Sequence, residues 1–463
     1  MADSVNTREL ITDMLVTIDK GEEMSHILIR NVLDKYNYLP SIDKAFIKRV
    51  TEGTLERRIT IDYVINDFSN TPVNKMKPYI RNLIRMSVYQ IMYMDKVPES
   101  AACNEAVKLA NKHGFNNLSG FVNGVLRNIV RNKEGVVYPD EKHDLIVALS
   151  VKYSCPEIIV NTLIGDYGIE ETKKILKSFL KRRNLYVRIR EDIADEQKDM
   201  IKSEWHESGI GYEKSEFLPY AYALSTVDNL AGMFCFKDGL YTVQDLSSMM
   251  VAEIASPKAD SVVLDICGAP GGKSLHVATK MRKVWRNGHM TKKLGTVICR
   301  DVTENKVDLI RQNVERMHLE NIKAECFDAT VFDPAMMGVA DIVLADVPCS
   351  GLGVIGKKPD IKYNVTEESL NEICALQKKI IDNAVKYVKR GGALVYSTCT
   401  IRNKENEDMI KYILNNYDFV LDNVKDYVPP KLMGMVQKSG ALKLMPYDDR
   451  DGFFIARFIR NGH

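Results

Sequence analysis

The feature of the sequence that most restricts the fold is the alternation of short apolar segments with helical segments after about residue 241. Each candidate strand is followed by a polar or glycine-bearing turn, and helical stretches such as Lys306–His318 and Glu368–Val388 stand between the strands. This alternation is typical of a parallel, doubly wound α/β sheet. The candidate strands are Ser261–Ile266, Gly295–Cys299, Lys323–Phe327, Ile342–Ala345 and Ala393–Tyr396.

The rest of the chain follows other patterns, and its 463 residues are enough for two or three domains. Apolar residues recur at helical spacing in Leu10–Ile18 and Ile80–Ile91. The polar stretch Val137–Lys142 resembles a linker, and a mixture of helix and strand follows it. We therefore predict a multidomain protein with an all-α domain over residues 1–135, a small α+β RNA-binding module over 141–240 and a Rossmann-like α/β domain over 241–463.

The composition excludes several classes of protein. The nine cysteines are odd in number and contain no C-x-x-C pair, which argues against a disulfide framework and against a zinc site. No stretch has the roughly 20 apolar residues that span a bilayer. The first residues, Met1–Asn6, lack the basic and apolar parts of a secretion signal. We expect a cytoplasmic protein without a bound metal. The sequence contains no coiled-coil pattern that would indicate an oligomer.

Basic residues gather locally, although the net charge is only +2. Thr172–Arg190 holds eight basic residues and no acidic one, and Ile266–Arg300 is again basic, including Met281–Leu294, which we interpret as a loop. A solvated face is one explanation, whereas two such runs favour contact with a phosphate backbone. The candidate RNA-binding residues are Lys181, Arg182, Arg183, Arg188 and Arg190.

A glycine-rich turn and three aspartates follow the first four candidate strands. The turn reads Asp-Ile-Cys-Gly-Ala-Pro-Gly-Gly-Lys-Ser over residues 265–274, and its glycines allow close approach to a ligand. A nucleotide phosphate-binding loop would need glycine where Cys267 stands. Asp301, Asp328 and Asp346 follow the next three strands, and such carboxylates can bind ribose hydroxyls. These residues predict a nucleoside-bearing cofactor.

Two cysteines follow the fourth and fifth strands, Cys349 in Asp-Val-Pro-Cys-Ser-Gly and Cys399 in Ser-Thr-Cys-Thr. A thiolate that adds to carbon 6 of cytosine makes carbon 5 nucleophilic enough to accept a methyl group. The proton on carbon 5 must then leave before the enzyme is released, so a second thiol is useful. A protonated Asp346 near the N3 edge of the ring would favour the addition. This reasoning leaves open which cysteine attacks.

These segments closely resemble the RNA 5-methylcytosine methyltransferases of the Nol/Nop/Sun family. The matching segments also include Glu405-Asn406-Glu407, Gln244–Ser248 and Asp451–Phe454. The resemblance implies that Cys399 is the nucleophile, that Cys349 assists release, and that Lys273 and Asp346 lie near the target base. It further implies that S-adenosylmethionine is bound by Cys267, Gly268, Ala269, Pro270, Gly271, Gly272, Lys273, Asp301, Asp328 and Asp346.

The amino-terminal segment resembles the NusB family of all-helical RNA-binding domains, through Leu83–Gln90, Asn104–Val107 and Phe121–Arg127. A NusB-like domain fused to this type of methyltransferase is similar to the bacterial enzymes that modify 16S ribosomal RNA. The resemblance therefore implies 16S ribosomal RNA as substrate. Transfer RNA, another ribosomal cytosine, or an RNA-binding protein without activity are the alternatives.

The chain departs from the family pattern at several positions. Gly268 replaces a usual alanine, and Ser274 replaces a usual threonine. Glu157-Ile158 stands where tryptophan is common, and Val187–Arg190 replaces Leu-Arg-Val-Asn. These changes leave the predicted chemistry intact and concern the RNA site.

Overall fold

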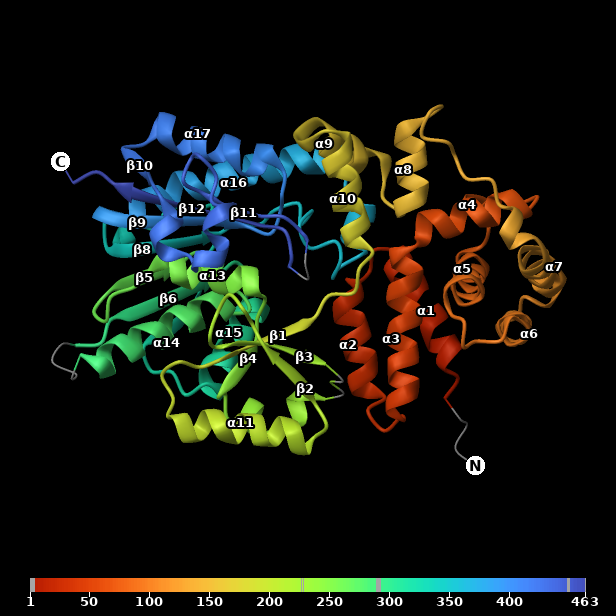
Figure 1. Cartoon of the computed structure of the whole chain (residues 1–463), viewed down its shortest axis with the longest axis horizontal. Helices are drawn as coiled ribbons and strands as arrows, with labels where there is room; N and C mark the ends of the chain where they lie inside the picture. Colours follow the sequence, from red (N-terminus) through yellow and green to blue (C-terminus); the bar gives the residue numbers. More distant parts are fainter. Residues whose placement is uncertain (1–4, 226, 228, 289–292, 448–449, 463) are drawn as a thin grey trace. The chain divides into compact units, whose positions relative to one another are not determined.

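The computed structural model of the chain describes residues 5–225, 227, 229–288, 293–447 and 450–462. The contacts within the chain define two compact units. The first consists of Met1–Leu180 together with Ile355–Val365, and the second of Lys181–Val354 and Thr366–His463. Figure 1 labels the helices and strands of both.

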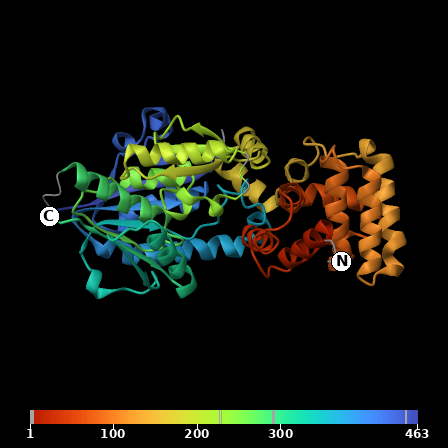
Figure 2. The same cartoon turned by 90° about the horizontal axis from the view of Figure 1, so that it is seen from below.

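The described part of the first unit is helical, as the sequence predicts. Apolar residues of α1, α3, α5 and α7, such as Leu15, Val50, Ile84 and Leu126, form its core. The orange helices α6 and α7 run side by side (Figure 2). Its helices are α1 (Thr7–Asp19), α2 (Ser25–Lys35), α3 (Ser41–Glu56), α4 (Arg58–Phe68), η1 (Val73–Lys75), α5 (Pro78–Tyr93), α6 (Glu99–Lys112), α7 (Asn116–Asn132), η2 (Lys133–Gly135), α8 (Leu145–Tyr153), α9 (Glu157–Tyr167), α10 (Ile169–Phe179) and η5 (Ile361–Asn364).

The length and apolar character of the helices bear on whether any of them could cross a membrane. Within the described residues, no helix is by itself long and apolar enough to span a bilayer. The helices α8 and α9 meet the length and composition of a membrane span only when taken together, and the pair is bent by 112°.

The segment Ile355–Val365 is fixed within the first unit by buried polar contacts. The carboxylate of Asp360 accepts hydrogen bonds from the backbone N–H of Ser25 at 2.8 Å and from its hydroxyl at 2.6 Å. Lys362 donates to the carbonyl of Glu56 at 2.8 Å. Burial lowers the pKa of Lys362 to about 8. This short stretch therefore belongs to the helical unit although it lies far along the chain.

A small antiparallel sheet begins the second unit. Its strands are β1 (Leu185–Ile189), β2 (Gly211–Lys214), β3 (Ala221–Ser225) and β4 (Tyr241–Val243), in the order β2-β3-β1-β4. The helix α11 (Asp195–Glu207) lies along this sheet (Figure 1), and its Trp205 is completely buried against Tyr222 and Tyr241. The helix α12 (Phe234–Lys237) precedes β4.

The division into units differs from the predicted domain limits at two points. The strand β4 lies beyond residue 240, yet Val243 pairs with Val187 of β1 in the small sheet. The helices α8–α10, which the prediction placed in the small module, group with the first unit. One reason is that the hydroxyl of Thr60 in α4 donates to the carbonyl of Val151 in α8 at 2.5 Å.

The larger sheet of the second unit is mostly parallel, in the order β10-β12-β9-β8-β5-β6-β7, with β11 paired to β12. The strands β5 to β9 are parallel to their neighbours, whereas β10, β11 and β12 are antiparallel. Its strands are β5 (Val262–Asp265), β6 (Thr296–Asp301), β7 (Ile322–Cys326), β8 (Ala340–Asp346), β9 (Val388–Thr398), β10 (Phe419–Asp422), β11 (Leu442–Leu444) and β12 (Phe453–Arg460).

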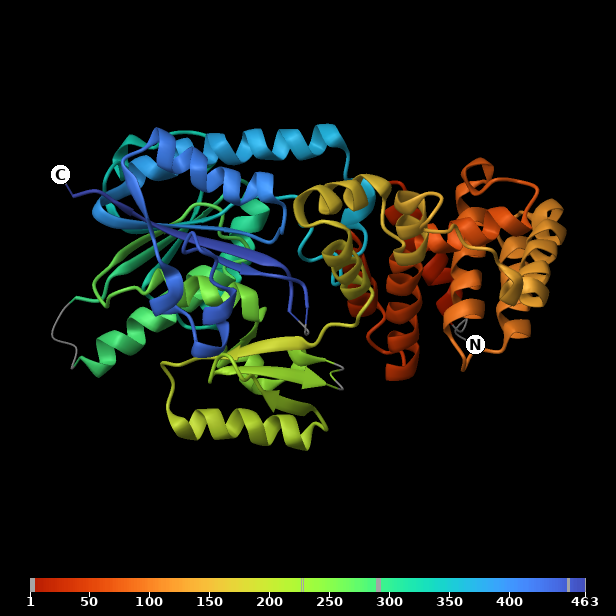
Figure 3. The ribbon, with the colours of Figure 1, turned by 45° about the horizontal axis from the view of Figure 1, so that its top comes forward.

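Helices cover both faces of this sheet (Figure 3). The strand residues alternate between two cores, since Val263 packs with the α13 and α14 side and Leu264 with the α16 and α17 side. The remaining helices are α13 (Leu246–Ala255), α14 (Gly272–Asn287), α15 (Glu304–Arg316), η3 (Leu230–Gly232), η4 (Pro334–Met336), α16 (Glu367–Tyr387), η6 (Asn403–Glu405), α17 (Glu407–Asn416), η7 (Val424–Tyr427) and η8 (Pro430–Met435).

The fold class predicted from the sequence is confirmed, and all five candidate strands correspond to β5 through β9. The antiparallel strands β10–β12 were not predicted. The interpretation of Met281–Leu294 as a loop is wrong for its first half, because α14 continues to Asn287. Residues 289–292 of that stretch lie outside the described residues. The strand order reverses at β5, and the carboxyl ends at such a point commonly bind ligands.

Candidate active site

The glycine-rich turn connects β5 to the first turn of α14. Gly271 precedes the helix with a φ of +104°, a conformation that favours glycine. Asp265, which is completely buried at the end of β5, accepts a hydrogen bond from the Ser274 hydroxyl at 2.6 Å. Burial raises the pKa of Asp265 to about 6. A buried carboxyl thus ties the start of the turn to the helix that follows.

The structure explains why Gly268 stands where the family usually has alanine. A Cβ atom at position 268 would lie 2.3 Å from the Sγ atom of Cys299 in the neighbouring strand β6. Cys299 is completely buried and packs in the core below the turn. Because the sulfur fills the space that an alanine methyl group would need, the glycine and the cysteine form a matched pair.

Asp301, at the end of β6, supports the turn from the other side. Its carboxylate accepts a hydrogen bond from the backbone N–H of Ala269 at 3.0 Å and lies 3.1 Å from the Lys306 ammonium group. Asp328, two residues beyond β7, is exposed and accepts hydrogen bonds from Thr330. Asp301 therefore holds the turn, whereas Asp328 is open to solvent.

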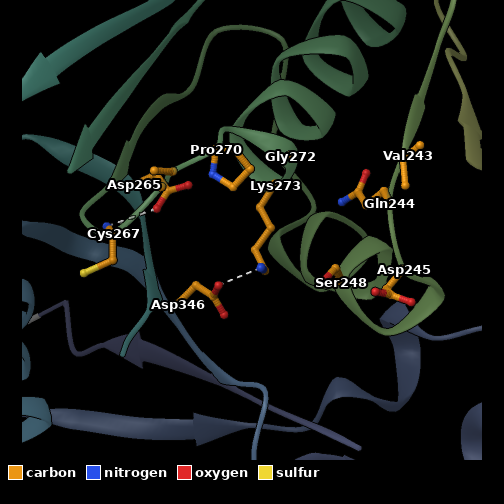
Figure 4. Close-up of a pocket in the computed structure, with 12 residues that line it drawn as sticks. Val243, Gln244, Asp245, Ser248, Asp265, Cys267, Pro270, Gly272, Lys273 and Asp346 are labelled. Carbon is orange, nitrogen blue, oxygen red and sulfur yellow. Dashed lines mark hydrogen bonds and ion pairs between the residues drawn. The ribbon is translucent and has the colours of Figure 1, made fainter. Parts of the chain in front are cut away.

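A cavity of about 170 Å³ lies between this turn and the start of α13 (Figure 4). Seven of the predicted residues line it, namely Cys267, Gly268, Ala269, Pro270, Gly272, Lys273 and Asp346. Sequence reasoning missed Val243, Gln244, Asp245, Ser248 and Asp265 as lining residues. The signal for three of them, Gln244, Asp245 and Ser248, was the family-like stretch Gln244–Ser248, to which no role was given. The predicted Gly271, Asp301, Asp328, Cys349 and Cys399 are described but are not lining residues of this cavity.

An ion pair crosses one side of the cavity (Figure 4). Lys273 Nζ lies 2.6 Å from the carboxylate of Asp346, whose other oxygen accepts a hydrogen bond from Ser397 at 2.7 Å. Burial acts to lower the pKa of Lys273, but the Asp346 carboxylate more than offsets this and raises it above its usual value. Lys273 Nζ also lies 5.6 Å from the centre of the Phe453 ring. The predicted pair of Lys273 and Asp346 is thus assembled in the structure.

The two cysteines that follow β8 and β9 converge. The Sγ atoms of Cys349 and Cys399 are 3.1 Å apart, and neither residue forms a disulfide. The hydrogen bond to Cys399, together with burial, raises the pKa of the Cys349 thiol well above its usual value. Ser397, two residues before Cys399, donates to the Asp346 carboxylate that pairs with Lys273, and negative charge on Cys399 acts to raise the pKa of Lys273. The two sulfurs and the lysine therefore belong to one site.

The Glu-Asn-Glu stretch holds both cysteine loops in place. Glu405, which is completely buried, accepts hydrogen bonds from the backbone N–H of Ser350 at 2.9 Å, from its hydroxyl and from Gln377 at 2.9 Å. Asn406 accepts from the Thr398 hydroxyl at 2.7 Å and donates to the carbonyl of Thr400 at 3.0 Å. The residues on both sides of Cys399 and the residue after Cys349 are therefore fixed by adjacent side chains.

Two predicted RNA-binding residues are buried, and this part of the prediction is wrong. Arg188 is completely buried in β1 and donates to the Gln244 side chain at 2.7 Å, and Arg190 is paired with Asp192 at 2.8 Å. Arg183 is partly buried and donates to the carbonyl of Pro446 at 2.7 Å. Lys181 and Arg182 are exposed.

A separate cluster of potential metal ligands lies near Arg188. Glu191, Glu253 and His276 place one ligand atom each within 4.8 Å of one another. The Lys280 ammonium group already lies 2.7 Å from Glu253 and 3.6 Å from Glu191, so a cation of the chain itself pairs with both carboxylates.

Known protein families match both the amino-terminal and the carboxyl-terminal part of the chain. Residues 252–459 match the family model described as 16S rRNA methyltransferase RsmB/F, and residues 5–131 match the NusB family. The probable ribosomal RNA small subunit methyltransferase B of Bacillus subtilis is 35% identical over 99% of both chains. The protein of the same description from Synechocystis is 28% identical, over 98% of this chain and 99% of its own.

Solved structures have the same fold. The crystal structure of PH0851 superposes with a TM-score of 0.79 at 24% identity, covering 98% of this chain and 99% of that one. NSun6 from Pyrococcus horikoshii with SFG superposes with a TM-score of 0.56 at 21% identity, covering 66% and 98%. The fold and the site define a Rossmann-like methyltransferase. The chain belongs to the RsmB/F family of 16S rRNA methyltransferases and carries a NusB-family domain in its amino-terminal part.

Proposed function

We propose that the protein methylates carbon 5 of a cytosine in 16S ribosomal RNA, with S-adenosylmethionine as methyl donor. The observation that carries this proposal is the 3.1 Å distance between the sulfurs of Cys349 and Cys399, in a site that also holds the Lys273–Asp346 pair. Methyl transfer to an oxygen or an exocyclic nitrogen needs no thiol nucleophile. Two converging thiols suit transfer to a ring carbon instead.

The cavity suits the amino-acid end of S-adenosylmethionine. A side chain at Gly272 would extend into open space, so the backbone here can lie close to a ligand. The buried Nε2 atom of Gln244 lacks a hydrogen-bond partner in the described structure. The cofactor would be held by the Cys267–Lys273 turn and Asp346, with Asp301 and Asp328 near its nucleoside part. When bound, it supplies an electrophilic methyl group.

The chemistry begins with Cys399. Its thiolate adds to carbon 6 of the flipped-out cytosine, and the new C–S bond makes carbon 5 nucleophilic. We assign the stabilisation of the N3 edge to Lys273 and Asp346 together, because the Lys273 ammonium group donates to the Asp346 carboxylate with an Nζ–O distance of 2.6 Å. Carbon 5 would then form a bond to the methyl group, while the donor's sulfonium sulfur would keep the electron pair of the broken S–CH3 bond and leave as a neutral thioether.

Release of the product requires Cys349. Its thiolate, after its own proton has passed to solvent, removes the proton from carbon 5, and the electrons of that C–H bond restore the ring double bond. The bond between carbon 6 and Cys399 then breaks, and Cys399 leaves as thiolate. A thiol whose pKa is raised well above its usual value gives a strongly basic thiolate, which suits this step.

The family and the relatives support the RNA substrate. Both curated relatives are described as ribosomal RNA small subunit methyltransferases, and the chain matches them over nearly its whole length. The exposed Lys181 and Arg182 remain candidates for contact with the RNA backbone. We also propose a cytoplasmic location, which a ribosomal RNA substrate would favour.

The proposal is tested with labelled S-adenosylmethionine and 16S RNA. C399A should lose methyl transfer, whereas C349A should accumulate a protein–RNA adduct that survives denaturation. C326S is the matched control, because Cys326 is exposed and lies outside the cavity lining. Full turnover by both C399A and C349A would contradict the mechanism. Bisulfite sequencing of a deletion strain identifies the cytosine, and a lost mark in transfer RNA would contradict the substrate.

A further inference from the structure

Gln244 lies at one wall of the cavity, between β4 and α13 (Figure 4). Its backbone N–H donates to the carbonyl of Tyr186 at 3.1 Å, so the main chain is tied to the small sheet. Only 6% of the residue is exposed, although it lines the cavity. Its side chain is therefore held in a largely dry environment next to the proposed cofactor site.

Arg188 fixes the orientation of the Gln244 amide. Arg188 Nε donates to Gln244 Oε1 at 2.7 Å, and Arg188 Nη1 donates to the Thr279 hydroxyl at 3.2 Å. A guanidinium group has only donors, so the amide oxygen must face it. The amide nitrogen of Gln244 is consequently directed away from Arg188, toward the side of the cavity on which Lys273 lies in Figure 4.

The nitrogen of this amide has no hydrogen-bond partner within the described part of the chain. Buried donors in folded proteins are nearly always paired, and an unpaired one costs free energy. A donor that is fixed in orientation and faces a cavity indicates a ligand atom that accepts a hydrogen bond.

The opposite wall of the cavity favours a negatively charged acceptor. It contains Gly272 and Lys273, the first residues of the 16-residue helix α14. The N–H groups of a first helical turn lack partners within the helix and attract anions. Asp265 also lines the cavity, and its carboxyl oxygens can accept a hydrogen bond from a ligand donor, which fits an ammonium group.

We infer that Gln244 Nε2 and the first turn of α14 bind the carboxylate of the methionyl group of S-adenosylmethionine, and that Arg188 is the positioning residue that orients Gln244. This inference rests on the proposed function, since it specifies how the proposed cofactor is recognised. It gives Gln244 a binding role and makes the buried Arg188 part of cofactor recognition.

The test compares S-adenosylmethionine with decarboxylated S-adenosylmethionine, which lacks only the carboxylate. Both are titrated calorimetrically into the full-length protein without RNA. Q244M keeps the length of the side chain and removes the donor, so the Kd for S-adenosylmethionine should rise roughly tenfold or more. The Kd for the decarboxylated compound should stay unchanged. Q197M, on the distant helix α11, is the control for the type of substitution.

Arg188 is tested by a double-mutant cycle. R188M should also weaken binding of S-adenosylmethionine, but Q244M/R188M should bind no worse than Q244M, because Arg188 acts through Gln244. R188K, which can still donate to the amide oxygen, should restore part of the affinity. Melting temperatures identify variants that lose affinity by unfolding, and these are compared at a temperature at which they are folded.

Several outcomes would overturn the inference. Equal weakening of both compounds by Q244M would show that Gln244 shapes the cavity without binding the carboxylate. An unchanged Kd for S-adenosylmethionine would exclude the hydrogen bond, and additive losses in the double variant would exclude the role of Arg188. Wild-type protein that binds neither compound would overturn the proposed function, and the inference with it.

Discussion

The two cysteine loops and the glycine-rich turn meet in one site but are held by different means. The loops of Cys349 and Cys399 depend on one buried acid, Glu405, and on its neighbour Asn406. The glycine-rich turn depends on Asp265 and Asp301, which come from two different strands, and on close backbone packing. The surroundings of Cys349 and Cys399 therefore depend on two adjacent residues, whereas the proposed cofactor turn is supported from two strands.

The largest effect is expected from removal of Glu405, the buried acid that holds the Cys349 loop. E405A removes the carboxylate that accepts hydrogen bonds from Ser350 and Gln377. It also removes the buried negative charge that lies 3.8 Å from the Arg402 guanidinium group. We expect a loss of about 3–5 kcal/mol in the free energy of unfolding. Urea denaturation measures it, with D408A as control, because Asp408 on the neighbouring helix is exposed and pairs with the exposed Lys411. A loss below about 1 kcal/mol would mean that the cysteine loops are not held by Glu405.

The next effect concerns the pH dependence of the glycine-rich turn. The pKa of Asp265 is about 6 in the folded protein, against roughly 3.9 for an unfolded aspartate. The folded state favours the protonated carboxyl, so this contribution to stability is complete below about pH 4 and is lost as the pH rises through 6.

The unfolding free energy of the wild type, measured relative to D265N, should therefore fall by about 2–3 kcal/mol between pH 4 and pH 7. Denaturation curves for both proteins across this range give the difference directly. D301N is the comparison variant at the same turn. A difference that does not change with pH would mean that Asp265 does not carry a raised pKa.

A smaller effect is expected from the matched pair of Gly268 and Cys299. G268A places a methyl group 2.3 Å from the Cys299 sulfur and should cost about 1–3 kcal/mol of stability. G268A/C299A should recover most of this loss, because the second change removes the sulfur. The four proteins of the cycle are compared by denaturation. Additive losses in the double variant would rule out the pairing.

The smallest effect is expected outside both loops. K181E/R182E changes two exposed residues and should weaken RNA binding modestly while leaving the Kd for S-adenosylmethionine unchanged. If both side chains contact phosphates, the salt dependence of binding should become shallower by roughly 0.7–0.9 per contact, as counterion release requires. An unchanged salt slope would assign these residues to the solvated surface.

The strands of the large sheet and the loops that follow them could be predicted, because the short-range pattern of apolar and polar residues determines where each strand ends. Alternating strands and helices place Asp265, Asp346 and Cys399 at the same edge of a parallel sheet, whatever the side-chain details. The glycine at 268 is different. Its departure from the family pattern was visible, but its cause is a sulfur on another strand, 31 positions away in the sequence, which no local pattern reveals.

The basic stretch Thr172–Arg190 shows most clearly what could not be predicted from the sequence. Lys181 and Arg188 look alike in the sequence, yet one is exposed and the other is completely buried. The difference arises because Arg188 meets Gln244 and Thr279, which belong to segments far along the chain. Gln244 was missed for another reason: a single glutamine carries no charge and no periodicity, and no role was given to the family-like stretch that contains it.

The position of Ile355–Val365 within the helical unit affects how this protein can be dissected. A fragment that starts at residue 181 would keep Asp360 and Lys362 but would lose Ser25 and Glu56, the groups that satisfy them. Such a truncation would remove the groups that bury and pair Asp360 and Lys362, so the segment that follows Cys349 would lose the contacts that hold it. Failure of the shortened enzyme would then report a damaged scaffold, and only a fragment whose 355–365 stretch is replaced by a polar loop could measure what the helical part contributes to RNA recognition.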